Sequence, residues 1–273
     1  MHLGQLKWNN TVTAAIFENE QARPIPEYNL LDLIQRSEKE HMDLAVLAAR
    51  LAAPHLQAAP ALIPLAPREV WACDRNYEGS GSIDGFRVSV DRIDRPEIFF
   101  KGTARVCVGP GQNIGIRSDS RFTAPEPELA LVLGSKGRVI GYTIGNDVSA
   151  WDIERDNPLY LTQSKTFTGC CALGPVMVTA DEIPDPYDLP VNCKVERAGR
   201  TIFSGEASTA LLQRRFNTLV EFLLIGNPVP AGSVLLTGTG IIVPREAALM
   251  PGDVVTIRVP GIGVLSNTAA AVV

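Results

Sequence analysis

The stretch PEPELALVLGSKGRVIGYTIGND, residues 125–147, contains two apolar runs joined by a glycine-rich segment. The GSKG sequence at 134–137 is a strong turn signal, and the flanking runs have the composition of strands. The stretch therefore predicts an antiparallel hairpin. Glu126 and Glu128 are two residues apart at the start of its first strand, so they share one face, and Pro127 suits the first position of a strand.

Asp147 follows the returning strand of this hairpin. If the turn centres near Ser135 and Lys136, residue 126 lies opposite roughly residue 145, and Asp147 comes just past that point. Three carboxylates so close together resist full ionisation unless a cation neutralises them. Oxygen ligands favour Mg²⁺, with Mn²⁺ or Ca²⁺ as alternatives, over zinc or copper. Glu126, Glu128 and Asp147 are thus candidate metal ligands, although the pattern also fits a solvated strand end followed by a turn residue.

Short runs rich in valine and isoleucine, broken by glycine and proline, continue from Val70 almost to the last residue. They include REVWAC, EIFFKG, RVCVG, GPVMVT and DVVTIRV, and they predict a β-rich main domain. A helix is expected in STALLQRRFNTLVEFLLIG because six apolar residues there form one stripe at helical spacing. These residues are Leu211, Leu212, Phe216, Leu219, Val220 and Leu223.

The first part of the chain reads as a small α+β unit. Two extended pieces, LGQLKW and TVTAAIF, precede a segment that predicts one amphipathic helix, with Asn29 as its cap. Its apolar stripe consists of Leu30, Leu33, Ile34, Leu44 and Leu47. The proline- and alanine-rich APHLQAAPALIPLAP then reads as a connector. The boundary is placed near Pro67, which gives an N-terminal unit at 1–67 and a main domain at 68–273.

Composition narrows the class of protein. With 273 residues, of which 45% are hydrophobic, the chain is long enough to bury a full core. A net charge of −5 without any run of Lys or Arg argues against a nucleic-acid partner. No apolar stretch approaches the roughly 18 residues that span a bilayer, and the start does not resemble a signal peptide. Five cysteines without C-x-x-C spacing suggest reduced thiols. We therefore expect a soluble, cytoplasmic protein.

A series of short motifs adds a resemblance. E-x-E, N-D-V-S, K-x-F, A-L-G-P, T-G-T and P-G-D occur in this order between Val70 and the C-terminus. In this the chain resembles the fumarylacetoacetate hydrolase superfamily. The resemblance implies a mixed β-sandwich roll, usually paired as a homodimer. It also implies Mg²⁺ held by Glu126, Glu128 and Asp147.

Two departures separate the chain from the hydrolases of that superfamily. The hydrolases carry a histidine in the stretch after an N-Y motif, whereas RNYEGSGSIDGF has none. They also tend to carry Arg and Gln after N-D-V-S-A, where this chain has Trp151 and Glu154. By contrast, RPEIFFKG, IRSDS, NPLYL and LTGTGI resemble the sugar-acid dehydratase branch. The chain's three histidines all precede Pro67: His2, His41 and His55.

The dehydratase branch implies a lyase acting on a small 2-oxo acid. The reaction removes water from a 2-keto-3-deoxy sugar acid, such as 2-keto-3-deoxy-D-arabinonate, to give 2-oxoglutarate semialdehyde. A metal that chelates the 2-oxo acid is a Lewis acid that stabilises the enolate formed when C3 loses a proton. The resemblance assigns the acid and base roles to Glu97, in RPEIFF, and Lys165, in QSKTF.

The substrate contacts and two other functions stay open. Thr239, in TGTG, is a candidate partner for the substrate carboxylate, or an ordinary turn residue. Lys101 is a candidate counter-charge for the substrate, or a strand-end lysine. Ser80 and Tyr77 lie in the loop where the hydrolases keep their histidine. The same metal site fits an acylpyruvate-type hydrolase or an oxo-acid decarboxylase, and Trp151 leaves room for a catalytically silent binding protein.

Overall fold

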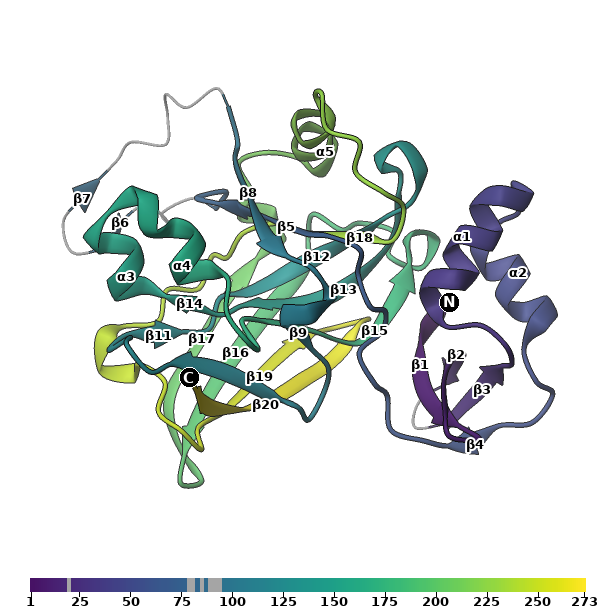
Figure 1. The fold of residues 1–273 in the computed structure, drawn as a ribbon, viewed down its shortest axis with the longest axis horizontal. Helices are drawn as coiled ribbons and strands as arrows, with labels where there is room; N and C mark the ends of the chain where they lie inside the picture. Colours follow the sequence, from purple (N-terminus) through teal and green to yellow (C-terminus); the bar gives the residue numbers. More distant parts are fainter. Residues whose placement is uncertain (19–20, 78–81, 84–85, 88–94) are drawn as a thin grey trace.

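The computed structural model describes residues 1–18, 21–77, 82–83, 86–87 and 95–273, and two sheets dominate this part of the chain (Figure 1). The large sheet contains, in spatial order, β4 (Gln57–Ala58), β3 (Gln21–Ile25), β2 (Thr11–Glu18), β1 (His2–Trp8), β15 (Cys171–Thr179), β13 (Val139–Asp147), β12 (Pro127–Leu133), β18 (Ser233–Leu236), β5 (Val70–Asp74) and β8 (Glu97–Gly102), with β9 (Cys107–Val108) paired to β15. The second sheet contains β10 (Asn113–Arg117), β20 (Gly263–Val272), β19 (Val254–Val259), β16 (Pro190–Arg197) and β17 (Arg200–Ser208). Two short ribbons pair β11 (Thr123–Ala124) with β14 (Ser149–Ala150), and β6 (Ser82–Ile83) with β7 (Phe86–Arg87).

Helices lie at both ends of this strand framework. The helices α1 (Leu30–Glu40) and α2 (Leu44–Leu51) lie beside β1, β2 and β3, whereas α3 (Trp151–Asp156) and α4 (Leu161–Lys165) lie at the opposite end of the molecule (Figure 1). The helix α5 is Phe216–Leu224. Single 3₁₀ turns occur at Ala104–Val106, Ser135–Gly137, Pro158–Tyr160, Ala180–Glu182, Thr209–Leu211 and Arg245–Ala247.

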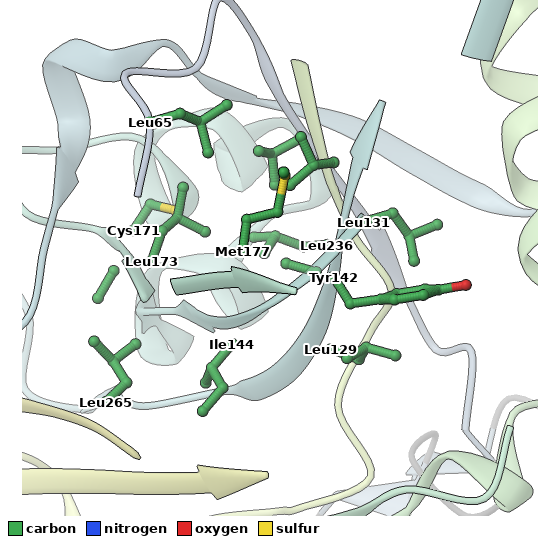
Figure 2. Close-up of a cluster of buried hydrophobic side chains, with 14 of the residues drawn as sticks. Leu65, Leu129, Leu131, Tyr142, Ile144, Cys171, Leu173, Met177, Leu236 and Leu265 are labelled. Atoms are coloured by element: carbon green, nitrogen blue, oxygen red, sulfur yellow. The ribbon is translucent and has the colours of Figure 1, made fainter. Parts of the chain in front are cut away.

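Part of the hydrophobic core lies between the two sheets, and part lies under α1 and α2. Leu265 of β20 lies near Ile144 of β13 and Leu173 of β15, and all three are fully buried (Figure 2). Burying a leucine or isoleucine side chain in this way contributes about 1.5–3 kcal/mol. Strand pairs of both directions occur, since β18 runs parallel to β5 and β12 runs antiparallel to β13. The predicted β-rich α+β class with a mixed sandwich of sheets is confirmed.

The predicted hairpin is β12–β13, and Pro127 is the first residue of its first strand. The register differs from the prediction, because Glu128, not residue 126, lies opposite Gly145. The strands also pass a bulge: Leu133 pairs with Val139 but Val132 pairs with Gly141, so Ile140 is the extra residue.

The bulge decides which face Asp147 occupies. A register shift of one residue would turn every side chain of one strand to the other face. Relative to the predicted register, the turn contributes a shift of one residue and the bulge contributes a second. The total shift is two residues, so each side chain stays on its predicted face of the hairpin. Asp147 therefore shares a face with Glu126, and its N–H donates to the Glu126 carbonyl at 2.9 Å.

Two helix predictions need correction. The segment after Asn29 forms two helices, because His41 adopts a left-handed conformation (φ 52°) that ends α1, and Asp43 caps α2. Asn29 caps α1 as predicted. The helix predicted around residues 208–226 begins only at Phe216, so Leu211 belongs to a 3₁₀ turn and is 46% exposed.

The N-terminal strands continue the large sheet. β1 pairs with β15 through two residue pairs, His2 with Val178 and Leu3 with Met177. The division into 1–67 and 68–273 stays a prediction. Within the described residues, no helix has both the length and the apolar character needed to cross a membrane.

Candidate metal centre and active site

Three acidic side chains of the β12–β13 hairpin meet at one end of the large sheet. Glu126, Glu128 and Asp147 are all buried, and one carboxylate oxygen from each lies within 4.8 Å of the others. They converge because Glu126 and Glu128 are two residues apart and Asp147 lies opposite Glu126. The sequence prediction brought these same three residues together.

The two carboxylate oxygens of Glu128 differ in their hydrogen bonds. Its Oε2 accepts a hydrogen bond of 2.6 Å from the Gly238 N–H, whereas its Oε1 has no hydrogen-bond partner among the described residues. Gly238 has φ +94°, a conformation that side chains rarely adopt, so a glycine is required where this N–H meets the carboxylate. A buried carboxylate oxygen without a donor is costly unless a cation is supplied.

Glu126 is engaged on both oxygens. Lys165 Nζ lies 3.0 Å from Oε1 and 2.9 Å from Oε2, and the indole N–H of Trp151 also donates to Oε1. The backbone N–H of Glu126 donates to Asn146 Oδ1 at 3.1 Å, which fixes the chain just before β12. Trp151 reaches the site because α3 starts directly after β14 and packs its ring edge-on against Phe122, at 5.2 Å between centroids.

Two buried lysines bring positive charge to the cluster. Lys165, the last residue of α4, also donates to Ser149 Oγ at 2.7 Å. Lys101, near the end of β8, forms an ion pair with Asp147 and donates to the Val148 carbonyl at 3.0 Å. The Lys101 side chain is fully buried, and its ion-pair partner is Asp147. Its predicted contact with the substrate stays a prediction.

Burial and mutual repulsion set the ionisation of these groups. Burial raises the pKa of Glu126 to about 7, against the opposing effect of Lys165. Burial and the charges of Asp147 and Glu126 raise the pKa of Glu128 well above its ordinary value. Burial favours the neutral amine of Lys165, but the nearby carboxylates outweigh it, so the pKa of Lys165 is well above its ordinary value. Lys165 is thus an ammonium in this structure.

The donor set fits a hard divalent cation. When fully ionised, the three carboxylates carry one negative charge more than the two lysines neutralise, and Glu128 Oε1 has no hydrogen-bond partner in the described part of the chain. Oxygen-only ligands select Mg²⁺, Mn²⁺ or Ca²⁺ rather than zinc or copper. Glu126, Glu128 and Asp147 are the residues that would hold such an ion.

Glu97, the second residue predicted for proton transfer, lies at the start of β8. It shares a strand face with Phe99 and Lys101, and the Phe99 ring lies 5.4 Å from Lys165 Nζ. Its carboxylate binds the Arg75 guanidinium through both oxygens, with 2.6 Å between Nε and Oε2. Glu97 is therefore on the side of β8 that faces the lysine, and it is 30% exposed.

The predicted substrate contacts are only partly placed. Thr239 directly follows Gly238, is partly exposed, and its Oγ1 accepts the Ile241 N–H at 3.1 Å. Tyr77 is buried, and burial together with the charge of Glu128 raises the pKa of its hydroxyl above the ordinary value. Ser80 lies outside the described residues. All three roles stay predictions.

Three groups around Lys165 were given no role in the site by the sequence analysis, although it named Trp151 and Glu154. Ser149 contacts its ammonium directly, Trp151 shares Glu126 with it, and Glu154 Oε2 lies 3.6 Å from it. The available signal was the two-residue spacing of Asp147, Ser149 and Trp151. Because β14 continues the alternation of β13, residues at this spacing lie on the same face as Asp147. Glu154 depends on how α3 folds back over α4, which no local pattern indicates.

Comparison with known proteins agrees with this geometry. Residues 69–270 match the model of the fumarylacetoacetate (FAA) hydrolase C-terminal family. The chain is 46% identical to 2-dehydro-3-deoxy-D-arabinonate dehydratase of Saccharolobus solfataricus, over 74% of this chain and 72% of that protein. It is 40% identical to a probable 2-keto-3-deoxyxylonate dehydratase of Haloferax volcanii, over 78% and 75% respectively.

A solved structure has the same fold. It is 2-keto-3-deoxy-D-arabinonate dehydratase complexed with magnesium and 2,5-dioxopentanoate, and it matches with a TM-score of 0.83 at 36% identity, over 100% of this chain and 99% of that one. The chain belongs to the fumarylacetoacetate hydrolase family and has its β-roll fold, as the sequence motifs indicated.

Proposed function

We propose that the protein is a Mg²⁺-dependent hydro-lyase that removes water from a 2-keto-3-deoxy sugar acid. The substrate is 2-keto-3-deoxy-D-arabinonate or a close analogue, and the product is 2-oxoglutarate semialdehyde, which is 2,5-dioxopentanoate. The observation that carries the proposal is the buried, oxygen-only cluster of Glu126, Glu128 and Asp147 with a lysine against it. The relatives that carry dehydratase names add to its support.

The chemistry needs more than one proton transfer. Loss of a proton from C3 and of the C4 hydroxyl gives a 3,4-unsaturated 2-oxo acid whose C5 still carries a CH2OH group. Transfer of a proton from C5 to C3 then gives the C4–C5 enol, and protonation of this enol at C4 gives the aldehyde. The bound cation would supply Lewis acidity toward a 2-oxo acid. Two acid–base side chains beside the substrate suit this series of proton transfers.

Glu97 and Lys165 are the proposed pair. Lys165 carries a proton in this structure, so it begins as an acid that protonates the leaving C4 hydroxyl. The Glu97 carboxylate is then the base that accepts the C3 proton. Glu97 must exchange its contact with Arg75 for one with the substrate, and its partial exposure allows this. Thr239, Tyr77, Ser80 and Lys101 remain candidates for holding the rest of the substrate.

We also propose a cytoplasmic enzyme that works as a homodimer or a higher homo-oligomer. The homodimer rests on the family resemblance, and the cytoplasmic location rests on the reduced-thiol composition. Size-exclusion chromatography with light scattering tests the assembly. A monomer at micromolar concentration would contradict it.

A substrate panel tests the function. Purified protein with Mg²⁺ is incubated with 2-keto-3-deoxy-D-arabinonate and, separately, with an acylpyruvate, and the products are identified by NMR. We expect 2,5-dioxopentanoate from the first and no reaction with the second. Carbon–carbon cleavage of the acylpyruvate would favour the hydrolase alternative instead. No turnover of either substrate would favour a silent binding protein.

A further inference from the structure

The two buried lysines of the site differ in how they are held. Lys101 donates to the Val148 carbonyl and pairs with Asp147, and no second carboxylate contact of its ammonium occurs among the described residues. Lys165 instead contacts three carboxylates: both oxygens of Glu126, Asp147 Oδ2 at 3.6 Å and Glu154 Oε2 at 3.6 Å. In the part of the chain that the structure describes, Lys165 therefore has an alternative carboxylate partner, whereas Lys101 contacts the Asp147 carboxylate alone.

The three proposed metal ligands are also unequal. Glu128 Oε1 has no hydrogen-bond partner among the described residues, and neither does Asp147 Oδ2. Both oxygens of Glu126, by contrast, are occupied by the Lys165 ammonium. A cation that takes an oxygen of Glu126 must compete with this ammonium. Among the three proposed metal ligands, Glu126 is thus the one with both oxygens hydrogen-bonded to Lys165.

Glu154 is well placed to receive the lysine. It lies in the middle of α3, is 24% exposed, and stands outside the carboxylate cluster. Ser164 Oγ lies 3.5 Å from its Oε2, next to Lys165 in the chain. A movement of about 1 Å would bring Nζ from 3.6 Å to hydrogen-bond distance of this oxygen.

We propose that Lys165 occupies Glu126 as an internal counter-ion in the metal-free protein, and that Glu154 is the positioning residue that receives the Lys165 ammonium when Glu126 binds the divalent cation. The inference rests on the metal site of the proposed function. Lys165 stays an ammonium throughout, so only its partner changes. The exchange would also free Glu126 without leaving a buried ammonium unpaired, which would otherwise be costly.

A double-mutant cycle on Mg²⁺ affinity tests the inference. Isothermal titration calorimetry is performed on the wild type, Lys165→Met, Glu154→Gln and the double variant after treatment with a chelator. Removing the competitor in Lys165→Met should tighten Mg²⁺ binding about tenfold, and Glu154→Gln should weaken it about threefold. Because Glu154 acts through Lys165, its substitution should change the affinity by less than about 1.5-fold when Lys165 is already Met.

Simple electrostatics gives a different result. If Glu154 only adds a negative charge near the ion, Glu154→Gln weakens binding equally in both backgrounds, and the proposal is overturned. Asp156→Asn is the matched control, because it removes one charge from an exposed position of the same helix. It should leave the affinity within about 1.5-fold of the wild type.

A crystal structure of the wild type with Mg²⁺ gives a second measurement that needs no variant to fold. Lys165 Nζ should lie within about 3.2 Å of Glu154 and beyond about 3.5 Å from both Glu126 oxygens. An ammonium still on Glu126 beside the ion would overturn the inference. If the wild type binds no Mg²⁺, the proposed function fails as well. If it binds Mg²⁺ and dehydrates the sugar acid with no effect of Glu154→Gln, only this inference fails.

Discussion

The middle and the acidic end of the β12–β13 hairpin are equally buried but differently stabilised. In the middle, Leu129, Leu131 and Ile144 are 0% exposed and pack in the core that Figure 2 shows. At the acidic end, Glu128 is 0% and Asp147 is 1% exposed. Burying a leucine contributes about 1.5–3 kcal/mol, whereas burying a carboxylate costs free energy unless it is paired.

The difference shows where the two ends find their partners. The apolar middle is satisfied by packing against neighbouring strands, so it defines the fold. The acidic end depends on groups from distant segments, namely the Gly238 N–H, the Trp151 indole, Lys101 and Lys165. Stability and metal binding should therefore respond to different substitutions along the same two strands.

The largest effect is expected from Asp147→Asn, at the acidic end of the hairpin. The substitution keeps the size of the buried side chain but removes the charge of one proposed ligand. Mg²⁺ affinity should fall by about 100-fold or more, since changes to the surroundings of a ligand alone cost 10–100-fold. Calorimetric titration measures this, with Asp156→Asn as the control that removes the same charge from an exposed position. An Asp147→Asn variant that binds Mg²⁺ like the wild type would refute the role of Asp147 as a ligand.

A pair of substitutions then separates packing from charge. Leu131→Ala should lower the free energy of unfolding by about 3 kcal/mol, because it leaves a cavity in the core. Glu128→Gln should leave the metal-free protein at least as stable as the wild type at pH 7, because burial and the neighbouring carboxylates disfavour the ionised form of Glu128, and the amide keeps an oxygen for the Gly238 N–H. Urea unfolding in the presence of a chelator measures both. Equal losses would mean that the two ends are not stabilised differently.

A smaller effect is expected from pH. The pKa of Glu126 is raised from 4.5 to about 7, so its contribution to stability is fully present below pH 4.5 and is lost as the pH rises through 7. The melting temperature of the metal-free protein should fall by roughly 4 °C between pH 5 and pH 7.5. Saturating Mg²⁺ should offset this fall, because the ion binds the ionised carboxylates.

Melting curves with and without Mg²⁺ after chelation measure this prediction. Glu126→Gln is the control, and its metal-free melting temperature should depend less on pH. A wild-type melting temperature that rises over the same interval without metal would contradict the assigned direction of the pKa shift.

Local patterns predicted the strands better than they predicted the helices. The PEPE start and the GSKG turn located the hairpin because turn chemistry and strand alternation act over a few residues. The break between α1 and α2 was missed because His41, not glycine, takes the left-handed conformation. Asp43 before an apolar run was the signal that a second helix begins there.

The cluster of Glu126, Glu128 and Asp147 was predictable because the two glutamates are two residues apart at the start of one strand and Asp147 ends the returning strand of the same hairpin. The register was not, because the bulge at Ile140 depends on how β13 pairs on both sides. The contact of Lys165 with Glu126 brings residues 39 positions apart in the chain together, through the path of α3 and α4. Lys101 reaches Asp147 across 46 positions, so no short pattern could assign that pair.

The central claim is that Glu126, Glu128 and Asp147 together bind the divalent ion on which dehydration depends. The most direct measurement is the rate of 2,5-dioxopentanoate formation when Mg²⁺ is added back to chelator-treated wild type and Glu128→Gln. We predict that Mg²⁺ restores the wild-type rate and that Glu128→Gln stays at least about 1000-fold slower. Full activity of the chelated wild type, or a Glu128→Gln variant that Mg²⁺ restores, would contradict the claim.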